Sequence, residues 1–567
     1  MNETAILHIP DSKYCFATGD KAVILRLRTA RTDNFDAVSV VYGGKYDFSQ
    51  TRRKAELAKK HTDKLYDYYT ARLELDDVRL VYVFELKIGG GTYCFSEDGL
   101  TEGYDFALAY FNAFQLPYIN AIDVCREVKW MRGAVFYQIF IDRFFRGDRE
   151  KDDSYINLKW GDIPNPKSFA GGDLKGVTEK LGYLSDLGVN VLYLTPIFRS
   201  ISNHKYDISD YYDIDRHFGG NEDFRELVTA AHKMGIRIVL DAVFNHCSER
   251  LPQFQDVVKK GRGSRYYDWF VINGEFPTKS PLNYECFAAC GYMPKFNTSN
   301  KEVQRFLIGV AEFWIREYGI DGWRLDVSDE VSHNFWRRFR ESVKELKEDF
   351  AVIGENWHDA NPFLQGDQWD GIMNYAFTKA CYDFFCEGKT DARGLAERLS
   401  GLLMRNTDQA NAMMLNILDS HDTHRFLTQV KGDQNKLLCA LALTFMYVGA
   451  PGLYYGTEIG MNGGYDPDCR RTFDWGKADA DTPIMRAVKG LIDLKKRAAL
   501  RDGDIKLSAE NGLFILERAA GERALRLTLN NMKENAGTGI TGKVILSHNL
   551  AGNILKAGGF MIEEIGA

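Results

Sequence analysis

Eight short apolar runs, separated by longer amphipathic segments, occupy the middle of this 567-residue chain. Residues 174–187 illustrate the separating segments, with Leu181, Leu184 and Leu187 on one helical face. Apolar strands that alternate with amphipathic helices are typical of an α/β fold, and eight such units predict a (β/α)8 TIM barrel. The predicted strands are residues 135–140, 189–194, 236–241, 321–325, 351–354, 370–374, 413–418 and 452–455.

The barrel accounts for only part of the chain, so further domains are expected. Residues 1–120 contain β-branched, alternating runs and a Gly-Gly-Gly turn, which predict an N-terminal β-sandwich. The barrel is predicted over 121–246 and 298–482. An inserted small domain after strand three is predicted at 247–297, because a connection of about fifty residues is too long for a plain loop. The last barrel helix and a C-terminal β-sandwich are predicted at 483–567.

Charge and cysteine content argue against several other classes of protein. The net charge of −7 gives no reason to expect nucleic acid or an anionic membrane as partner. Ten scattered cysteines and a start without a basic and apolar leader predict a cytoplasmic protein with free thiols. Cys286 and Cys290 have no second Cys or His pair at zinc spacing, which argues against a metal there. The uncharged run 437–455 is interrupted by Gly449 and Pro451, which predicts a buried helix and strand instead of a membrane span.

Acidic side chains follow several of the predicted strands. Strand four ends in Arg324-Leu-Asp326, strand five is followed by Glu355, and strand seven by His421-Asp422. The C-terminal ends of parallel barrel strands meet at one rim, where the active sites of such barrels lie. Alternation along strand four places Arg324 and Asp326 on the same side. We therefore expect three carboxylates at one rim.

Two neighbouring carboxyl groups suit the hydrolysis of a glycosidic bond, which needs an ionised nucleophile and a protonated acid. Arg324 is expected to lower the pKa of Asp326, which suits the nucleophile. Glu355 faces other acids and lies two residues before Trp357, so its pKa is expected to be raised, which suits the acid. The alternative is an Arg–Asp ion pair that only closes a strand.

Four segments around these residues resemble, in order, the signature segments of the α-amylase superfamily of retaining glycosidases. A fifth, Met293-Pro-Lys-Phe-Asn297, resembles the motif that marks its neopullulanase, cyclomaltodextrinase and maltogenic amylase group, with Phe where Leu is expected. The resemblance extends over essentially the whole chain. The four segments are Asp241-Ala-Val-Phe-Asn-His246, Gly322-Trp-Arg-Leu-Asp-Val327, Gly354-Glu-Asn-Trp357 and Ser420-His-Asp-Thr423.

The resemblance implies a role for each matched residue. Asp326 would be the nucleophile, Glu355 the general acid/base, and Asp422 the carboxylate that orients the sugar in the transition state. Tyr206 would stack on the sugar ring at the cleavage subsite. The residues implied to bind substrate are His204, Tyr206, His246, Arg324, Trp357, His421, Asp466 and Arg470.

The resemblance also implies an activity and a partner. The expected activity is retaining hydrolysis of α-1,4-glucosidic bonds in cyclodextrins, pullulan or maltodextrins, with transglycosylation as a side reaction. The alternatives are an oligo-1,6-glucosidase, or a glucan transferase or isomerase that uses the same residues. A catalytically inactive binding subunit is disfavoured, because all three acids are present. The expected assembly is a homodimer in which the N-terminal sandwich of one chain covers the cleft of the other, and the alternative for that sandwich is a starch-binding module.

Members of this group often hold calcium near the first barrel strand, through a loop that resembles residues 145–153 and a later Gly-Asp. Here Asp148, Asp152 and Asp173 stand at ligand positions. Arg146 and Lys151 replace neutral side chains, and their charge would repel the ion. We expect that the calcium site is lost, that ion pairs replace it, and that no cofactor is required. The alternative is a surviving site in which Glu150 or Asp153 serves as a ligand.

Overall fold

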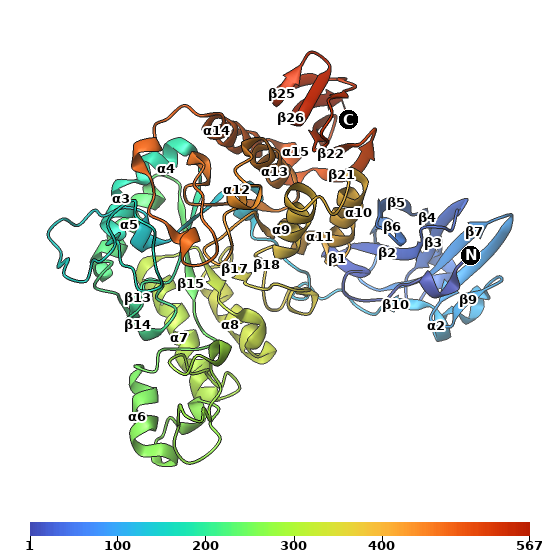
Figure 1. The fold of residues 1–567 in the computed structure, drawn as a ribbon. Coiled ribbons are helices and arrows are strands. Elements are labelled where there is room, and N and C mark those ends of the chain that lie inside the picture. The colour runs from blue at the N-terminus through green and yellow to red at the C-terminus, as the bar shows by residue number, and fades with distance from the viewer. Residues whose placement is uncertain (567) are drawn as a thin grey trace.

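An eight-stranded parallel sheet lies at the centre of the structure, a computed structural model that describes residues 1–566 (Figure 1). The strand order is β18-β17-β16-β15-β12-β11-β20-β19, and a parallel bridge between Met373 and Leu415 joins the two outer strands. The sheet therefore closes, which confirms the predicted barrel. Its strands are β11 (Phe136–Ile139), β12 (Val191–Leu194), β15 (Arg237–Ala242), β16 (Gly322–Leu325), β17 (Ala351–Gly354), β18 (Gly371–Ile372), β19 (Leu415–Ile417) and β20 (Ala450–Tyr454).

Amphipathic helices surround the strands and bury their apolar faces against them. Helix α13 differs, because all its residues from Leu437 to Met446 are buried. Within residues 1–566, no helix is long and apolar enough to cross a membrane. The main helices of the barrel are α3 (Leu174–Glu179), α4 (Leu181–Leu187), α5 (Asn221–Lys233), α7 (Lys301–Tyr318), α8 (His333–Leu346), α9 (Tyr375–Cys381), α10 (Ala392–Leu403), α13 (Gln434–Met446) and α14 (Pro483–Lys495).

Local signals explain how the chain reaches the strand that precedes Asp326. The Asn300 side chain accepts hydrogen bonds from the backbone N–H groups of Glu302 and Val303 and so caps the start of α7. The helix ends at Gly319, whose φ of 69° is the left-handed conformation that glycine adopts most readily. The chain then enters β16, and Asp326 follows the last residue of that strand.

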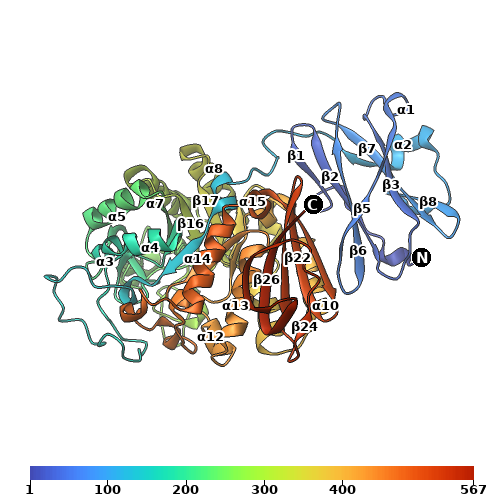
Figure 2. The same cartoon turned by 90° about the horizontal axis from the view of Figure 1, so that it is seen from above.

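The N-terminal domain consists of two antiparallel sheets, with Val23, Leu25, Val40, Tyr82 and Phe84 buried in its core. It lies to one side of the barrel in both cartoon views (Figures 1 and 2). One sheet contains β1 (Cys15–Gly19), β2 (Ala22–Ala30), β5 (Ala58–Thr62) and β6 (Tyr66–Glu74). The other contains β3 (Ala37–Gly43), β4 (Arg53–Glu56), β7 (Leu80–Ile88), β8 (Gly91–Ser96), β9 (Gly99–Thr101) and β10 (Phe114–Leu116).

The connection after β15 forms a separate projection that contains α6 (Pro252–Lys260), at the bottom of Figure 1. An antiparallel bridge between His246 and Lys295 ties its two ends together. Aromatic side chains fill its interior, and Phe254 packs edge-on against Phe270 and Tyr284. Because His246 lies at the base of the projection, its packing also positions one predicted site residue.

The C-terminal domain follows α14 and α15 (Ala498–Asp502). Its strands form one connected antiparallel sheet, whereas the sequence predicts a two-sheet sandwich. The reason is the length of β26, which pairs with β23 and β24 along one edge and with β25 along the other. The strands are β21 (Asp504–Glu510), β22 (Leu513–Ala520), β23 (Arg523–Asn530), β24 (Ala536–Gly537), β25 (Lys543–Ala551) and β26 (Ile554–Gly566).

Candidate active site

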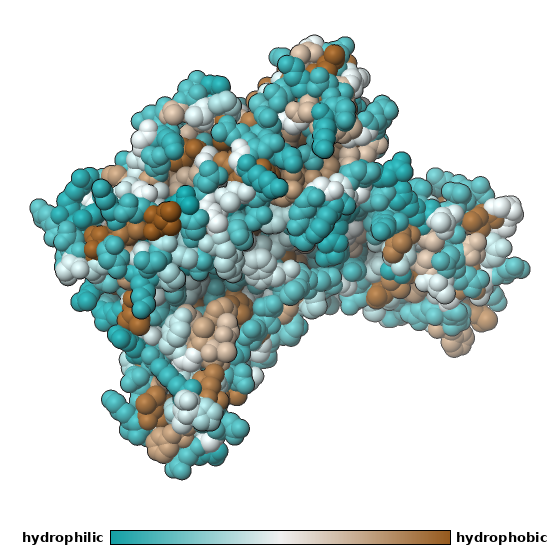
Figure 3. Space-filling model, viewed as in Figure 1, coloured by the Kyte–Doolittle hydropathy of each residue, from teal (hydrophilic) through white to brown (hydrophobic). Residues whose placement is uncertain are grey.

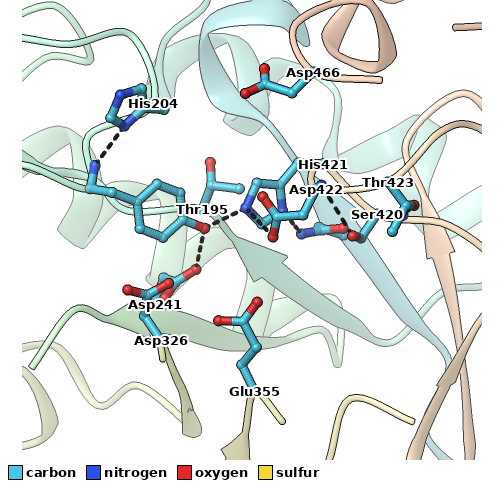
Figure 4. Close-up of polar contacts among 12 residues, drawn as sticks. Thr195, His204, Asp241, Asp326, Glu355, Ser420, His421, Asp422, Thr423 and Asp466 are labelled. Carbon is cyan, nitrogen blue, oxygen red and sulfur yellow. Dashed lines mark hydrogen bonds and ion pairs between the residues drawn. The ribbon is translucent and has the colours of Figure 1, made fainter. Parts of the chain in front are cut away.

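A cleft of about 800 Å³ opens at the C-terminal ends of the barrel strands. Nine of the eleven predicted catalytic and substrate-binding residues line it, and Arg324 and His421 lie buried behind its wall. The nine are His204, Tyr206, His246, Asp326, Glu355, Trp357, Asp422, Asp466 and Arg470. Figure 4 shows that the carboxyl groups of Asp326, Glu355 and Asp422 surround a common space, although they follow three different strands.

Arg324 joins the carboxylates at the floor of the cleft. Its Nη1 atom donates to Asp326 Oδ1 at 2.9 Å and to Asp241 Oδ1, also at 2.9 Å. Its Nη2 atom lies 2.8 Å from Glu355 Oε1 and 3.9 Å from Asp422 Oδ2. One guanidinium therefore fixes Asp326 and Glu355 side by side, and the predicted orientation of Arg324 and Asp326 toward the same side is confirmed.

Arg324 lowers the pKa of Asp326 as predicted, but the predicted net shift is wrong in sign. Burial raises the pKa of Asp326 well above its ordinary value, and the Arg324 guanidinium, although it opposes this rise, does not cancel it. The physical reason is that Arg324 divides one positive charge among Asp241, Asp326 and Glu355. Among the described residues, no donor bonds to the buried Asp326 Oδ2, and His246 Nε2 lies 3.9 Å from it.

Glu355 has the raised pKa that the sequence predicts. Burial raises it to about 7, against the opposing effect of Arg324 and with a further contribution from Asp422. Its Oε2 atom accepts a hydrogen bond of 3.0 Å from the backbone N–H of Val327. Val327 has a left-handed backbone, with φ 44° and ψ 45°, which is rare for a β-branched residue. This strained conformation turns its N–H toward the acid.

Asp422 is held in the ionised form. Burial alone would raise its pKa, but His421, Arg470 and Arg324 outweigh burial and lower it. Arg470 Nη2 lies 3.3 Å from Asp422 Oδ1, and Arg470 Nη1 lies 2.9 Å from Asp466 Oδ1. The backbone carbonyl of His421 accepts a hydrogen bond of 2.8 Å from Arg470 Nε. Arg470, in the loop after β20, thus fixes the side chain of Asp422, which follows β19.

The three predicted histidines are neutral at pH 7. Burial lowers the pKa of His246 and His421 to about 3 and that of His204 to about 4. His421 Nε2 lies 2.6 Å from Tyr206 Oη and 3.2 Å from Asp422 Oδ2. A neutral imidazole offers one donor and one acceptor, so these rings are suited to hydrogen bonding with hydroxyl groups.

Two residues that shape the site, Asp241 and Gln138, are given no role by the sequence prediction. Asp241 accepts hydrogen bonds from Tyr193 Oη at 2.6 Å and from Tyr206 Oη at 2.9 Å, besides its contact with Arg324. Gln138 Nε2 lies 2.6 Å from His421 Nδ1. Both residues lie at or near the C-terminal ends of strands, as the predicted residues do. A polar side chain at such a position is the sequence signal that could have identified them.

Aromatic side chains form much of the cleft wall. Trp357 is 48% exposed, and its ring stacks on Tyr375 at a centroid distance of 3.5 Å. Phe287, from the inserted domain, stacks on His246 at 4.9 Å. Exposed aromatic faces of this kind suit the apolar faces of sugar rings. Other lining residues, for which the sequence predicts no individual role, are Tyr292, Met293, Val327, Asp329, Glu330, Tyr382, Thr423, His424 and Tyr465.

The acids predicted as calcium ligands do not converge. Asp148 lies 3.0 Å from the ammonium of Lys175, Asp152 accepts from the backbone N–H of Ser154 at 2.9 Å, and Asp173 contacts Lys151 at 2.7 Å. In the part of the chain described, no three His, Cys, Asp or Glu side chains are grouped to hold a metal ion. Cys286 and Cys290 are free thiols.

Comparison with known proteins identifies the family. The α-amylase catalytic domain matches residues 138–489, and the α-amylase N-terminal ig-like domain matches residues 1–120. The chain belongs to the α-amylase family of glycoside hydrolases.

Three relatives match over almost their whole lengths. A cyclomaltodextrinase of Thermoanaerobacter pseudethanolicus is 41% identical over 94% of this chain and 93% of its own. An intracellular maltogenic amylase of Bacillus subtilis is 40% identical over 93% and 90%, and neopullulanase 2 of Thermoactinomyces vulgaris is 41% identical over 94% and 91%. The solved structure of a cyclomaltodextrinase superposes with a TM-score of 0.93 at 36% identity, covering 100% of both chains.

Proposed function

We propose that the protein hydrolyses α-1,4-glucosidic bonds of cyclodextrins, pullulan or maltodextrins and retains the configuration at the anomeric carbon. The observation that carries this proposal is the contact of one guanidinium, that of Arg324, with both Asp326 and Glu355 at the floor of an aromatic cleft. Two carboxyl groups held side by side favour the retaining route, in which they lie about 5–5.5 Å apart. The names of the relatives supply the substrate class.

In the first step, Asp326 Oδ2 forms a bond to the anomeric carbon while the bond from that carbon to the glycosidic oxygen breaks. Glu355 gives its proton to that oxygen. The structure supports these roles, because Asp326 Oδ2 is not engaged by a donor among residues 1–566 and the pKa of Glu355 is about 7. Ionised Asp422, fixed by Arg470, is placed to bind sugar hydroxyls beside the reacting carbon.

In the second step, Glu355 takes a proton from water, and the water oxygen displaces Asp326 from the sugar. A sugar hydroxyl in place of water gives transglycosylation, so the ratio of the two products depends on how the cleft binds the acceptor. Exposed Trp357, stacked on Tyr375, supplies a fixed surface for a sugar near the acid. The proposed steps use only carboxyl groups of this chain and water, and no cofactor is invoked.

The test is the anomer that is released first. Proton NMR during hydrolysis of maltotriose should show the α-anomer before mutarotation, and an initial β-anomer would overturn the proposal. Product analysis with β-cyclodextrin, pullulan, maltotriose and isomaltose ranks the substrates. Cleavage of isomaltose alone would favour the alternative, an oligo-1,6-glucosidase, and longer products without free glucose or maltose would favour a glucan transferase.

The proposed setting is a cytoplasmic homodimer. The B. subtilis relative is named as intracellular, and ten free cysteines suit a reducing compartment. In the proposed dimer, the N-terminal domain of one chain covers the cleft of the other. The exposed aromatic face around α2 of that domain supports this arrangement, and its test is given below with the assembly of the whole molecule.

A further inference from the structure

The ammonium group of Lys151 is enclosed by oxygen atoms beside the first barrel strand. Lys151 Nζ donates to Asp173 Oδ2 at 2.7 Å, to the carbonyl oxygen of Gly171 at 2.7 Å and to that of His217 at 3.0 Å. The three donors of the ammonium therefore meet three acceptors. The Lys151 side chain is only 9% exposed and that of Asp173 only 1%.

These oxygens come from segments that are distant in sequence, so the ammonium ties them together. Asp173 also caps α3 by accepting from the N–H of Gly176 at 2.8 Å, and it accepts from the N–H groups of Gly147 and Asp148 at 3.0 and 3.1 Å. The carbonyl of His217 belongs to the loop before α5. A cation at this point therefore holds the loop after β11, the start of α3 and the loop before α5 in one arrangement.

The residues around this point do not fit a calcium ion. Calcium takes six to eight oxygen ligands, and here three oxygens already bind the ammonium. The remaining acids are turned to other partners, since Asp148 pairs with Lys175 and Asp153 lies 3.2 Å from Arg146 Nη2. A divalent ion would also meet the charges of Lys151 and Arg146 at close range.

We propose that the Lys151 ammonium is the resident cation of this loop, that it takes the place of a divalent metal ion, and that its removal opens the oxygen cage to calcium. A cation on a tethered side chain is bound without loss of translational freedom and cannot be removed by a chelator. Burial lowers the pKa of Lys151, and Asp173 opposes that effect. Because the cation is part of the chain, we expect the loop to keep its arrangement in the absence of free metal.

The test compares the wild type with Lys151→Asn, which removes the ammonium and adds a side-chain carbonyl oxygen. Thermal denaturation is followed in excess EDTA and in calcium chloride, and calcium binding is measured by isothermal titration calorimetry. The wild-type midpoint should be the same in both solutions, with no calcium bound. Lys151→Asn should have a midpoint several degrees lower in EDTA, bind one calcium ion, and regain stability in calcium. Lys159→Asn, an exposed lysine in the same loop, is the matched control and should behave as the wild type.

Calcium binding by the wild type, or a lower wild-type midpoint in EDTA, would overturn the proposal. A Lys151→Asn variant that is as stable as the wild type in EDTA, or that does not respond to calcium, would overturn it as well. If the Asn variant does not fold, Lys151→Gln provides the same neutral oxygen donor on a longer side chain. None of these measurements depends on the proposed catalytic activity.

Discussion

Arg324 has a central role at the scale of single residues. It is fully buried and contacts Asp241, Asp326 and Glu355, so it lowers the electrostatic cost of keeping several carboxyl groups within one dry space. Its single positive charge cannot fully neutralise three carboxyl groups. Burial therefore still raises the pKa values of both Asp326 and Glu355, against the effect of Arg324.

Separate roles for the two acids predict different responses to substitution. Glu355→Gln should lower kcat on maltotriose by roughly 10²–10⁴-fold, because the leaving oxygen is no longer protonated. An aryl maltoside with a good leaving group should restore the first step and leave a slow second step. Asp326→Asn should be inactive on both substrates, because the covalent intermediate cannot form. Stopped-flow release of the aryl group measures the first step, and identical behaviour of the two variants would contradict the assignment.

The pKa of Glu355 predicts the alkaline limb of the pH profile. The acid must be protonated to act, so kcat/KM should fall as pH rises through about 7. At low pH the rate should fall again, because the raised pKa of Asp326 means that the nucleophile is protonated sooner than an exposed aspartate. Initial rates on an aryl maltoside between about pH 4 and 9 give the profile. Glu355→Gln should lose the alkaline limb, and its retention in that variant would contradict the prediction.

Sequence reasoning finds site residues where their positions depend on strand ends alone. Arg324, Asp326 and Glu355 follow from alternation and from the rim rule, and the structure places them together. Phe287 and Tyr465 line the same cleft but come from long loops. Their positions depend on tertiary contacts, such as the stacking of Phe287 on His246, that local pattern does not encode. The sign of the pKa shift of Asp326 was missed for a similar reason, because it depends on how many acids share one arginine.

At the scale of elements, the apolar runs predict all eight barrel strands, and β18 is one of those whose predicted and observed residues differ most. Residues 370–374 are predicted as strand, but only Gly371 and Ile372 form it. Asp370 before it is buried against Arg340 and Lys344, and Asn374 after it caps α9 by accepting from the N–H of Phe377. The hydrophobic pattern alone predicts a longer strand. Asp370 and Asn374 end it at both sides, because their side chains make ion pairs and a helix cap.

The short strand β18 also has no room for a side chain at Gly371. A Cβ atom on Gly371 would lie 1.9 Å from the backbone oxygen of Met413, so Gly371→Ala requires movement of the backbone. We expect a loss of roughly 1–3 kcal/mol in stability. Activity should fall too, because neighbouring Met373 contacts Arg324 Nε at 3.3 Å.

Gly182→Ala in α4 is the control for this prediction, since a Cβ atom there meets no atom within 4 Å. It should leave stability unchanged or raise it by up to about 1 kcal/mol, because alanine favours the helix. Midpoints of thermal denaturation and kcat/KM for both variants provide the comparison. Equal midpoints for the two variants would show that β18 tolerates the side chain.

At the scale of the whole molecule, buried cations fix the outer domains to the barrel. Arg26 of the N-terminal domain donates to the carbonyl of Asn406 at 2.7 Å and pairs with Asp408. Arg518 of the C-terminal domain donates to the carbonyl of Met446 at 3.2 Å, at the end of α13. Cations at helix C-termini complement the helix dipole. The N-terminal domain is therefore held in a fixed position and presents a fixed face to solvent.

That face contains exposed aromatic side chains around α2 (Ala109–Asn112). Tyr110 is 65% and Phe111 71% exposed, their ring centroids lie 4.1 Å apart, and Leu108 beside them is 48% exposed. The space-filling view shows hydrophobic residues on the surface of this domain (Figure 3). Adjacent exposed apolar side chains of this kind are characteristic of interaction surfaces. We expect this face to contact a second copy of the chain.

Tyr110→Ser/Phe111→Ser should therefore shift the protein from twice the chain mass of 64.6 kDa to a single chain in sedimentation velocity. Because the proposed partner domain covers the cleft, the double variant should also gain activity on soluble starch relative to β-cyclodextrin, since a polymer then reaches the site more easily. Ile554→Ser removes a 50% exposed apolar side chain from the C-terminal domain and should change neither property. A monomeric wild type would contradict the dimer. A double variant that stays dimeric would place the interface on another face, and a monomer with an unchanged substrate ratio would separate assembly from covering of the cleft.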